Sequence, residues 1–191
     1  MARPPKSYLL PSLIEHESCI SLTHSRCWDP TSRLKSSREE GAGFFQLTRA
    51  YNSSGTLRFD VIAELRSKYR TQLYELNWDN VYSRPDLQIR AGILKSKETY
   101  EIYKNVGANT IESLAFADAA YNGGIGGVNN ERRACKLSTS CDPSRWFGHT
   151  EHFCLKSKVA LYGTRSACDI NRYHVRDVIL IRSGKYSKYF N

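Results

Sequence analysis

The chain has 191 residues, of which 40% are hydrophobic and 25% are charged. This length suits one domain, and this composition is that of an ordinary globular protein. No apolar run approaches the roughly 18 residues that span a bilayer, so we expect no stable membrane insertion. The first residues lack an apolar segment followed by a small-residue cleavage site, so we expect no secretory signal peptide.

The net charge is +9, and it is unevenly distributed. Residues 131–191 contain twelve Lys and Arg against five Asp and Glu, and therefore seven of the nine net positive charges. Such a bias indicates an anionic partner, either nucleic acid, an anionic membrane surface or an acidic polymer. Solubility is the alternative explanation, and charge alone does not choose between them.

Six cysteines fall into three pairs that are local in sequence, which suits short-range disulfides in an oxidising compartment. Free buried thiols are the alternative. A zinc site is a weaker interpretation, because the spacing of these cysteines with His149 and His152 is looser than in known zinc sites. We therefore expect no metal and no cofactor. The cysteines are Cys19, Cys27, Cys135, Cys141, Cys154 and Cys168.

Apolar spacing and capping signals predict a predominantly α-helical single domain with little or no β-structure. A first helix is expected over 11–22, where Ser12 and Glu15 form a capping box and Ile20 continues the apolar spacing. Residues 23–40 are expected to form a loop. Further helices are predicted over 59–73, over 87–107 with Asp86 as cap, over 111–122 with Asn109 as cap, and over 170–183, with a loop-rich basic region before the last of these.

Glu17 is the first candidate for chemistry. A carboxyl group held in an apolar pocket keeps its proton near neutral pH and can act as a general acid, as glycosidic cleavage requires. An ordinary exposed helix residue is the alternative, and for Glu17 alone it is the better one.

Two glycine-rich segments accompany Glu17. In "GAGFFQ", residues 41–46, small residues permit close approach of a ligand before Gln46, an amide that both donates and accepts. In "AAYNGG", Tyr121 and Asn122 end a helix, and an aromatic ring next to an amide suits sugar binding. Each segment alone could equally be a turn and a helix cap.

Taken together and in this order, these segments resemble the catalytic domain of soluble lytic transglycosylases and goose-type lysozymes, glycoside hydrolase family 23. The family pattern is similar to Glu17-Ser18, then "GAGFFQ", then "AYNGG" from Ala120, then "NRYHV" with Tyr173. "LQIRAGIL" resembles the middle helix of the family. The resemblance covers roughly residues 10–185.

The resemblance implies a lysozyme-like domain with a substrate cleft over residues 1–191, with the basic, Cys-containing portion at 131–191. It implies that Glu17 is the catalytic acid and base. It further implies that the chain cleaves the β-1,4 bond between N-acetylmuramic acid and N-acetylglucosamine in peptidoglycan. The residues implied to bind the glycan strand are Ser18, Gly43, Gln46, Tyr121, Asn122 and Tyr173.

The chain departs from the family in three places. Phe45 replaces a usual methionine, the loop before Gly41 is long and carries Cys27 and Trp28, and Thr48 stands where goose-type lysozymes place an aspartate. Glu39 and Glu40 are the candidates for positioning a water molecule. Hydrolysis and intramolecular transglycosylation therefore both remain open.

The predicted setting is a monomeric bacteriophage endolysin made in the host cytoplasm, and the alternatives are a virion-associated enzyme that pierces the wall and a bacterial cytoplasmic relic. The endolysin would act on the wall from the periplasm after a separate holin opens the membrane, and its charge would bind the anionic cell envelope. The rival from another class is a non-catalytic basic protein that binds cell wall or nucleic acid. No nucleic-acid-binding module is recognisable, so we expect no nucleic-acid partner.

Overall fold

The computed structural model describes residues 8–190 and divides the chain into two compact units. The first unit is Leu13–Lys95, and the second contains the remainder on both sides of it. The residues that precede Tyr8, on which the signal-peptide expectation partly rests, lie outside the described part. The single catalytic domain stays a prediction.

Helix predominates, at about 54% of the structure, as expected. The expectation of little or no β-structure is wrong, because a small four-stranded sheet and a two-stranded ribbon are present. In chain order the helices and strands are α1 (Leu9–Ser18), β1 (Arg33–Lys35), β2 (Glu39–Ala42), η1 (Gly43–Phe45), β3 (Leu47–Tyr51), β4 (Leu57–Asp60), α2 (Val61–Lys68), α3 (Arg70–Leu73), η2 (Val81–Ser83), α4 (Pro85–Asn105), α5 (Thr110–Gly123), α6 (Ile125–Lys136), η3 (Thr150–His152), β5 (Ala160–Tyr162), β6 (Arg165–Ser166), α7 (Ala167–Val175), η4 (Arg176–Arg182) and α8 (Ser183–Ser187).

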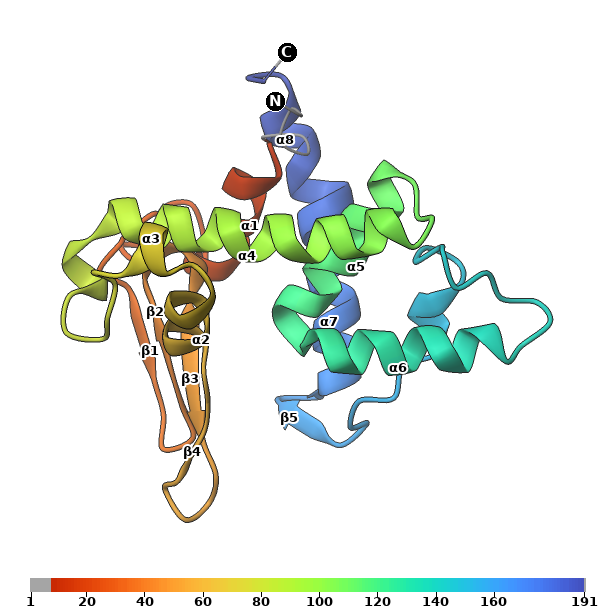
Figure 1. Cartoon of the computed structure of the whole chain (residues 1–191), viewed down its shortest axis with the longest axis horizontal. Coiled ribbons are helices and arrows are strands. Elements are labelled where there is room, and N and C mark those ends of the chain that lie inside the picture. Colours follow the sequence, from red (N-terminus) through yellow and green to blue (C-terminus); the bar gives the residue numbers. More distant parts are fainter. Residues whose placement is uncertain (1–7, 191) are drawn as a thin grey trace. The chain divides into compact units, whose positions relative to one another are not determined.

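The sheet of the first unit is antiparallel in the order β1-β2-β3-β4, and α2 packs against β3 (Figure 1). Strand β1 lies within residues 23–40, the segment expected to be a loop, and β2 begins there. The β3–β4 hairpin turns at Asn52, whose side-chain Oδ1 accepts hydrogen bonds from the N–H groups of Ser54 and Thr56. Gly55 completes this turn at φ +80°, a conformation that favours glycine.

Helix α1 begins earlier than predicted, at Leu9, and ends at Ser18. The capping box is wrong, because Ser12 lies inside the helix and its hydroxyl donates to the Tyr8 carbonyl at 2.8 Å. Glu15 is buried within the helix instead of near its N-terminus, and Ile20 lies beyond the helix with 78% of its surface exposed. Pro11 explains the shift, since proline is tolerated in the first turn of a helix.

Gln88 on α4 holds the glycine-rich loop of the first unit. Its side chain is completely buried, and its Nε2 donates to the Val81 carbonyl at 2.6 Å and the Pro30 carbonyl at 2.8 Å. Its Oε1 accepts from the N–H of Phe44 at 2.9 Å. A Cβ atom built on Gly43 would lie 2.0 Å from this oxygen, so only glycine fits there.

The second unit is built around α5, which packs against α6 and α7. Asn109 caps α5 as predicted, since its side chain accepts from the N–H of Glu112 at 3.1 Å. The ring of Phe116 stacks on Tyr103 and meets the edge of Trp146, with centroid distances of 4.9 and 5.5 Å. These aromatic contacts form the core of the unit.

Two features of the second unit depart from the prediction. The region expected to be loop-rich contains α6, whose buried face is formed by Val128, Glu131 and Cys135. The predicted final helix is present but longer, and it comprises α7, the π-helix η4 and α8. Within residues 8–190, no helix is long and apolar enough to cross a membrane.

Replacing Gly43 tests the buried Gln88 contact. Gly43 adopts φ +66°, so Gly43→Ala strains the backbone and also displaces Gln88 from its three hydrogen bonds. We expect the free energy of unfolding to fall by roughly 3 kcal/mol or more. Gly55→Ala is the matched control, because Gly55 also has positive φ but nothing lies within 4 Å of its Cβ position. It should cost about 1 kcal/mol. Equal losses of unfolding free energy for the two variants, measured by denaturant unfolding, would contradict the close contact between Gly43 and Gln88.

Candidate active site

Glu17 lies in the last turn of α1 and is half-buried. Ser18, the next residue, is buried, and its hydroxyl donates to the Ile14 carbonyl at 2.7 Å. The same oxygen accepts the backbone N–H of Trp28 at 3.3 Å. The hydroxyl of Ser18 therefore links the loop that contains Trp28 to the C-terminal end of α1. The glycan contact predicted for Ser18 stays a prediction.

Lys95 on α4 interacts electrostatically with Glu17. Burial lowers the pKa of the Lys95 ammonium to about 8, and this shift is opposed by the carboxylates of Glu17 and Glu64. A lysine whose pKa is lowered towards neutrality and which interacts with a half-buried carboxyl group is typical of functional sites.

The loop Gly41–Gln46 is compact and strained. Gln46 adopts the left-handed conformation, with φ 43° and ψ 51°, although it has a side chain. Its Nε2 donates to the Gly43 carbonyl at 2.9 Å, while its Oε1 is buried and has no hydrogen-bond partner among the described residues. A Cβ on Gly41 would lie 2.6 Å from that oxygen. Strain of this kind persists where the surroundings fix it, often at functional sites.

Glu40 is committed to a buried network within the sheet. Arg49, directly opposite on β3, donates to its Oε2 from Nε at 3.0 Å and from Nη2 at 2.7 Å. Arg33 Nε and the Tyr82 hydroxyl donate to its Oε1 at 2.6 and 3.0 Å. Burial opposes ionisation of Glu40, but the hydrogen bonds outweigh it and lower the pKa of Glu40. Burial and Glu40 together raise the pKa of Tyr82 to about 12.

Glu39 and Glu40 therefore differ as candidates for positioning water. Both oxygens of Glu40 are occupied, so a water-positioning role does not suit it. Glu39 precedes it on β2, so its side chain lies on the other face of the sheet, and it is half-buried. Glu39 is the better remaining candidate of the two.

In the second unit, Tyr121 and Asn122 lie at the C-terminal end of α5, as predicted. Asn122 is exposed, and its Oδ1 accepts from Asn171 Nδ2 at 3.0 Å. Asn171 is completely buried and also donates to the Ala119 carbonyl at 2.9 Å. Asn171 thus orients the amide of Asn122, and sequence reasoning missed it although it lies in the quoted "NRYHV" motif.

Tyr173 and His174 come from α7. Tyr173 is 43% exposed, and the guanidinium carbon of Arg165 lies 4.7 Å from the centroid of its ring. His174 is buried, its Nδ1 lies 2.7 Å from Asp118 Oδ2, and its ring stacks on Tyr121. The buried His174–Asp118 pair therefore packs against the ring of Tyr121.

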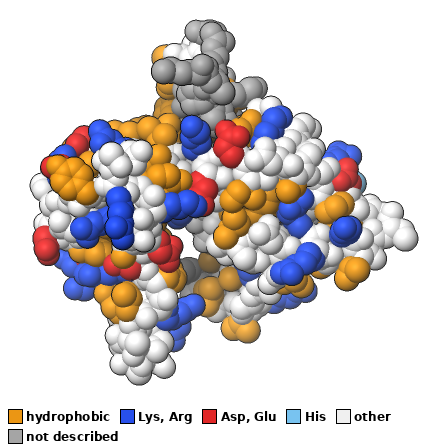
Figure 2. Space-filling model, in the orientation of Figure 1, with side chains coloured by type: hydrophobic (Ala, Val, Ile, Leu, Met, Phe, Trp, Pro, Cys, Tyr) orange, Lys and Arg blue, Asp and Glu red, His pale blue; other side chains and the backbone are white. Residues whose placement is uncertain are grey.

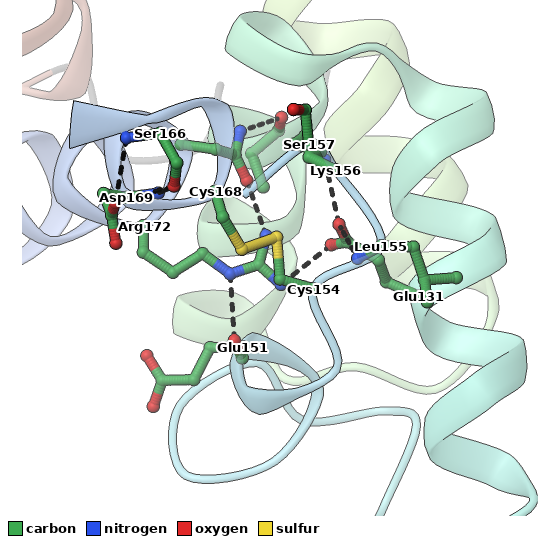
Figure 3. The surroundings of a disulfide bond; sticks show 12 residues. Glu131, Glu151, Cys154, Leu155, Lys156, Ser157, Ser166, Cys168, Asp169 and Arg172 are labelled. Atoms are coloured by element: carbon green, nitrogen blue, oxygen red, sulfur yellow. Dashed lines mark hydrogen bonds and ion pairs between the residues drawn. A yellow bond between two sulfur atoms is a disulfide. The ribbon is translucent and has the colours of Figure 1, made fainter. Parts of the chain in front are cut away.

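A buried acid anchors the segment that carries Cys154 (Figure 3). Glu131 on α6 is completely buried, and Lys156 Nζ and Arg172 Nη2 approach its oxygens at 3.0 and 2.9 Å. The Cys154–Cys168 disulfide joins the same segment to α7. A Cβ on Gly123 would lie 2.4 Å from Lys156 Cε, so a glycine at position 123 makes room for this lysine.

The cysteines are bonded in the three local pairs considered from the sequence, Cys19–Cys27, Cys135–Cys141 and Cys154–Cys168. All of them lie in the described part of the chain, and none is free there. The cysteines considered for a zinc site are therefore in disulfides and offer no thiolate ligand. Among residues 8–190, no cluster of three or more His, Cys, Asp or Glu could hold a metal ion.

The candidate residues belong to both units. The first unit contains the candidate acid, the two loop carboxylates and the glycine-rich loop, namely Glu17, Ser18, Glu39, Glu40, Gly43 and Gln46. The second unit contains the aromatic and amide candidates, Tyr121, Asn122 and Tyr173. Comparison of the chain with protein families, curated proteins and solved structures gives no match.

The Glu40 network predicts a pH-dependent stability. Its lowered pKa means that the ionised carboxylate stabilises the fold, fully above the ordinary value of 4.5 and progressively less as pH falls through the folded value. We expect Glu40→Gln to be less stable than wild type at pH 7, with the difference shrinking below pH 4.5. Glu75→Gln is the control, because its ion pair with Arg84 is exposed and should contribute little. A pH-independent difference would refute the network.

The charge of Lys95 is expected to destabilise the fold at neutral pH, whereas the charge of Glu40 stabilises it. Its folded pKa of about 8 lies below the ordinary 10.5, so the folded state carries the cost of the buried charge below pH 8. That cost disappears between pH 8 and 10.5, where the folded state releases its proton before the unfolded state does. Lys95→Met should be more stable than wild type at pH 7, by at most about 3 kcal/mol. Unfolding measurements from pH 7 to 10.5 should show this gain decline, and a constant gain would contradict burial of the charge.

Proposed function

We propose that the chain is a peptidoglycan-degrading muramidase that cleaves the β-1,4 bond between N-acetylmuramic acid and N-acetylglucosamine. The observation that carries the proposal is the ordered set of motifs, Glu17-Ser18, "GAGFFQ", "AYNGG" and "NRYHV". Their neighbours support it, because Gln88, from the quoted "LQIRAGIL" helix, holds the "GAGFFQ" loop, and Asn171 of "NRYHV" holds Asn122 of "AYNGG".

Glu17 is proposed as the acid and base of the reaction. As acid it protonates the leaving O4 of N-acetylglucosamine while the bond from the muramic C1 breaks. As base it then takes a proton from the group that attacks C1, either water or the 6-hydroxyl of the muramic residue. A half-buried carboxyl group retains contact with solvent and is therefore compatible with both steps.

The second unit supplies groups that suit an acetylated sugar. Asn122 presents an exposed amide whose orientation is fixed by Asn171, and amides hydrogen-bond to hydroxyl and acetamido groups. Tyr121 and Tyr173 present aromatic rings, which suit the apolar face of a pyranose. We propose these three residues as glycan-binding residues, with Gln46 and Gly43 shaping the loop of the first unit.

The proposed setting is lysis of a bacterial host by a phage enzyme acting at the cell wall. The three disulfides support an oxidising compartment such as the periplasm. Figure 2 shows Lys and Arg side chains scattered over the visible face, together with Asp and Glu side chains. A net charge of +9 would raise the association rate with an anionic envelope.

Removing the proton of Glu17 tests the function. Glu17→Gln keeps the size of the side chain but not its acidity, so lysis of permeabilised cells should fall at least about 100-fold while the protein stays folded. Glu64→Gln is the matched control, an exposed acid of the same unit that also acts on Lys95. It should retain wild-type activity. Undiminished lysis by Glu17→Gln would favour the non-catalytic binding protein.

A further inference from the structure

We propose that Trp28 is a glycan-binding platform beside the candidate acid, with its indole face stacked on a sugar ring. This inference rests on the proposed function and adds a residue that none of the motifs contains. Trp28 belongs to the long loop by which this chain departs from the family pattern.

The backbone of Trp28 is strained. It adopts φ 58°, and it shares positive φ only with Gln46 among the non-glycine residues of the described chain. For a bulky side chain the left-handed region is a true outlier, since Cβ approaches the following carbonyl. Such a conformation persists only when the surrounding structure fixes it, and a functional constraint is the usual reason.

Three covalent or hydrogen-bonded ties fix this turn. Cys27, the preceding residue, is bonded to Cys19 just after the end of α1. The Trp28 N–H donates to Ser18 Oγ at 3.3 Å, and Ser18 directly follows Glu17. Two residues further on, the Pro30 carbonyl accepts from the buried Gln88 at 2.8 Å. The turn is thus tied to the helix end that carries the candidate acid and to the amide that holds the "GAGFFQ" loop.

The strain does not serve to bury the ring. Trp28 is 40% exposed, whereas Trp146 is completely buried in the core of its unit. Trp78 is half-buried and donates from its indole nitrogen to Asp60 at 2.8 Å. A backbone held in an unfavourable conformation while 40% of the Trp28 surface stays exposed is better explained by presentation of the ring to a ligand than by packing in the core.

The chemistry of the ring identifies the class of ligand. A tryptophan face is flat, apolar and rigid, and it complements the C–H face of a pyranose, while the indole N–H can donate to a hydroxyl. A peptidoglycan strand offers such rings at every residue. Because the turn is fastened next to Glu17, a glycan that reaches the candidate acid is the ligand best placed to contact Trp28.

Binding measured without cleavage tests the platform. In the Glu17→Gln background, we expect Trp28→Ala to weaken binding of the N-acetylglucosamine tetramer about tenfold by calorimetry, and Trp28→Tyr to restore most of it. Co-sedimentation with purified peptidoglycan should rank the binding of the parent, Trp28→Tyr and Trp28→Ala in the same order. Tyr74→Ala is the matched control, because Tyr74 is an exposed aromatic residue of the same unit at 67% exposure. It should bind as the parent does.

The variant Trp28→Gly distinguishes a role of the indole ring in glycan binding from a role in the stability of the fold. Glycine adopts positive φ readily, so this variant should keep or raise the Tm while binding as weakly as Trp28→Ala. Mass spectrometry after alkylation verifies that the Cys19–Cys27 bond is intact. If Trp28→Ala and Trp28→Gly bind like the parent, the platform is wrong and the proposed function stands. If the parent binds neither glycan and the wild type releases no fragments, both proposals fall.

Discussion

The buried amide of Gln88 is the interaction on which the first unit depends. It joins α4 to three separate backbone segments, at Phe44, Val81 and Pro30, and it leaves none of its polar atoms without a partner. A buried amide that is fully hydrogen-bonded fixes one arrangement of its neighbours, because any other arrangement leaves a polar group unpaired. The glycine-rich loop and the strained turn at Trp28 both depend on it.

The second unit uses a buried charge for the same purpose. Glu131 is completely buried between Lys156 and Arg172, so loss of the Glu131 carboxylate would leave both cations without this partner. Arg172 donates in turn to Asn171, and Asn171 orients Asn122. Each unit therefore presents its candidate binding groups from a polar anchor in its own interior, which limits the motion of those groups.

Helices marked by a clear cap and a regular apolar spacing could be predicted from the sequence. Elements whose residues favour conflicting structures were missed. The Asn109 cap and the apolar α5 were predictable. Helix α6 was not, because its glycines and asparagines are poor helix formers and Glu131 occupies a core position. The segment "NSSGT" carries a hairpin turn signal, which the expectation of little or no β-structure left out. Gln88 and Asn171 could not be identified as anchors, because their roles come from contacts with residues distant in sequence.

The central claim is that this chain breaks the glycan strand of peptidoglycan, and its products test that most directly. Purified peptidoglycan digested by the wild-type protein should release soluble fragments that end in muramic acid, identified by mass spectrometry. Reducing ends would assign hydrolysis, and ends lighter by one water would assign intramolecular transglycosylation. Release of no fragments by the folded protein, with its three disulfides intact, would contradict the account and leave a basic wall-binding protein in its place.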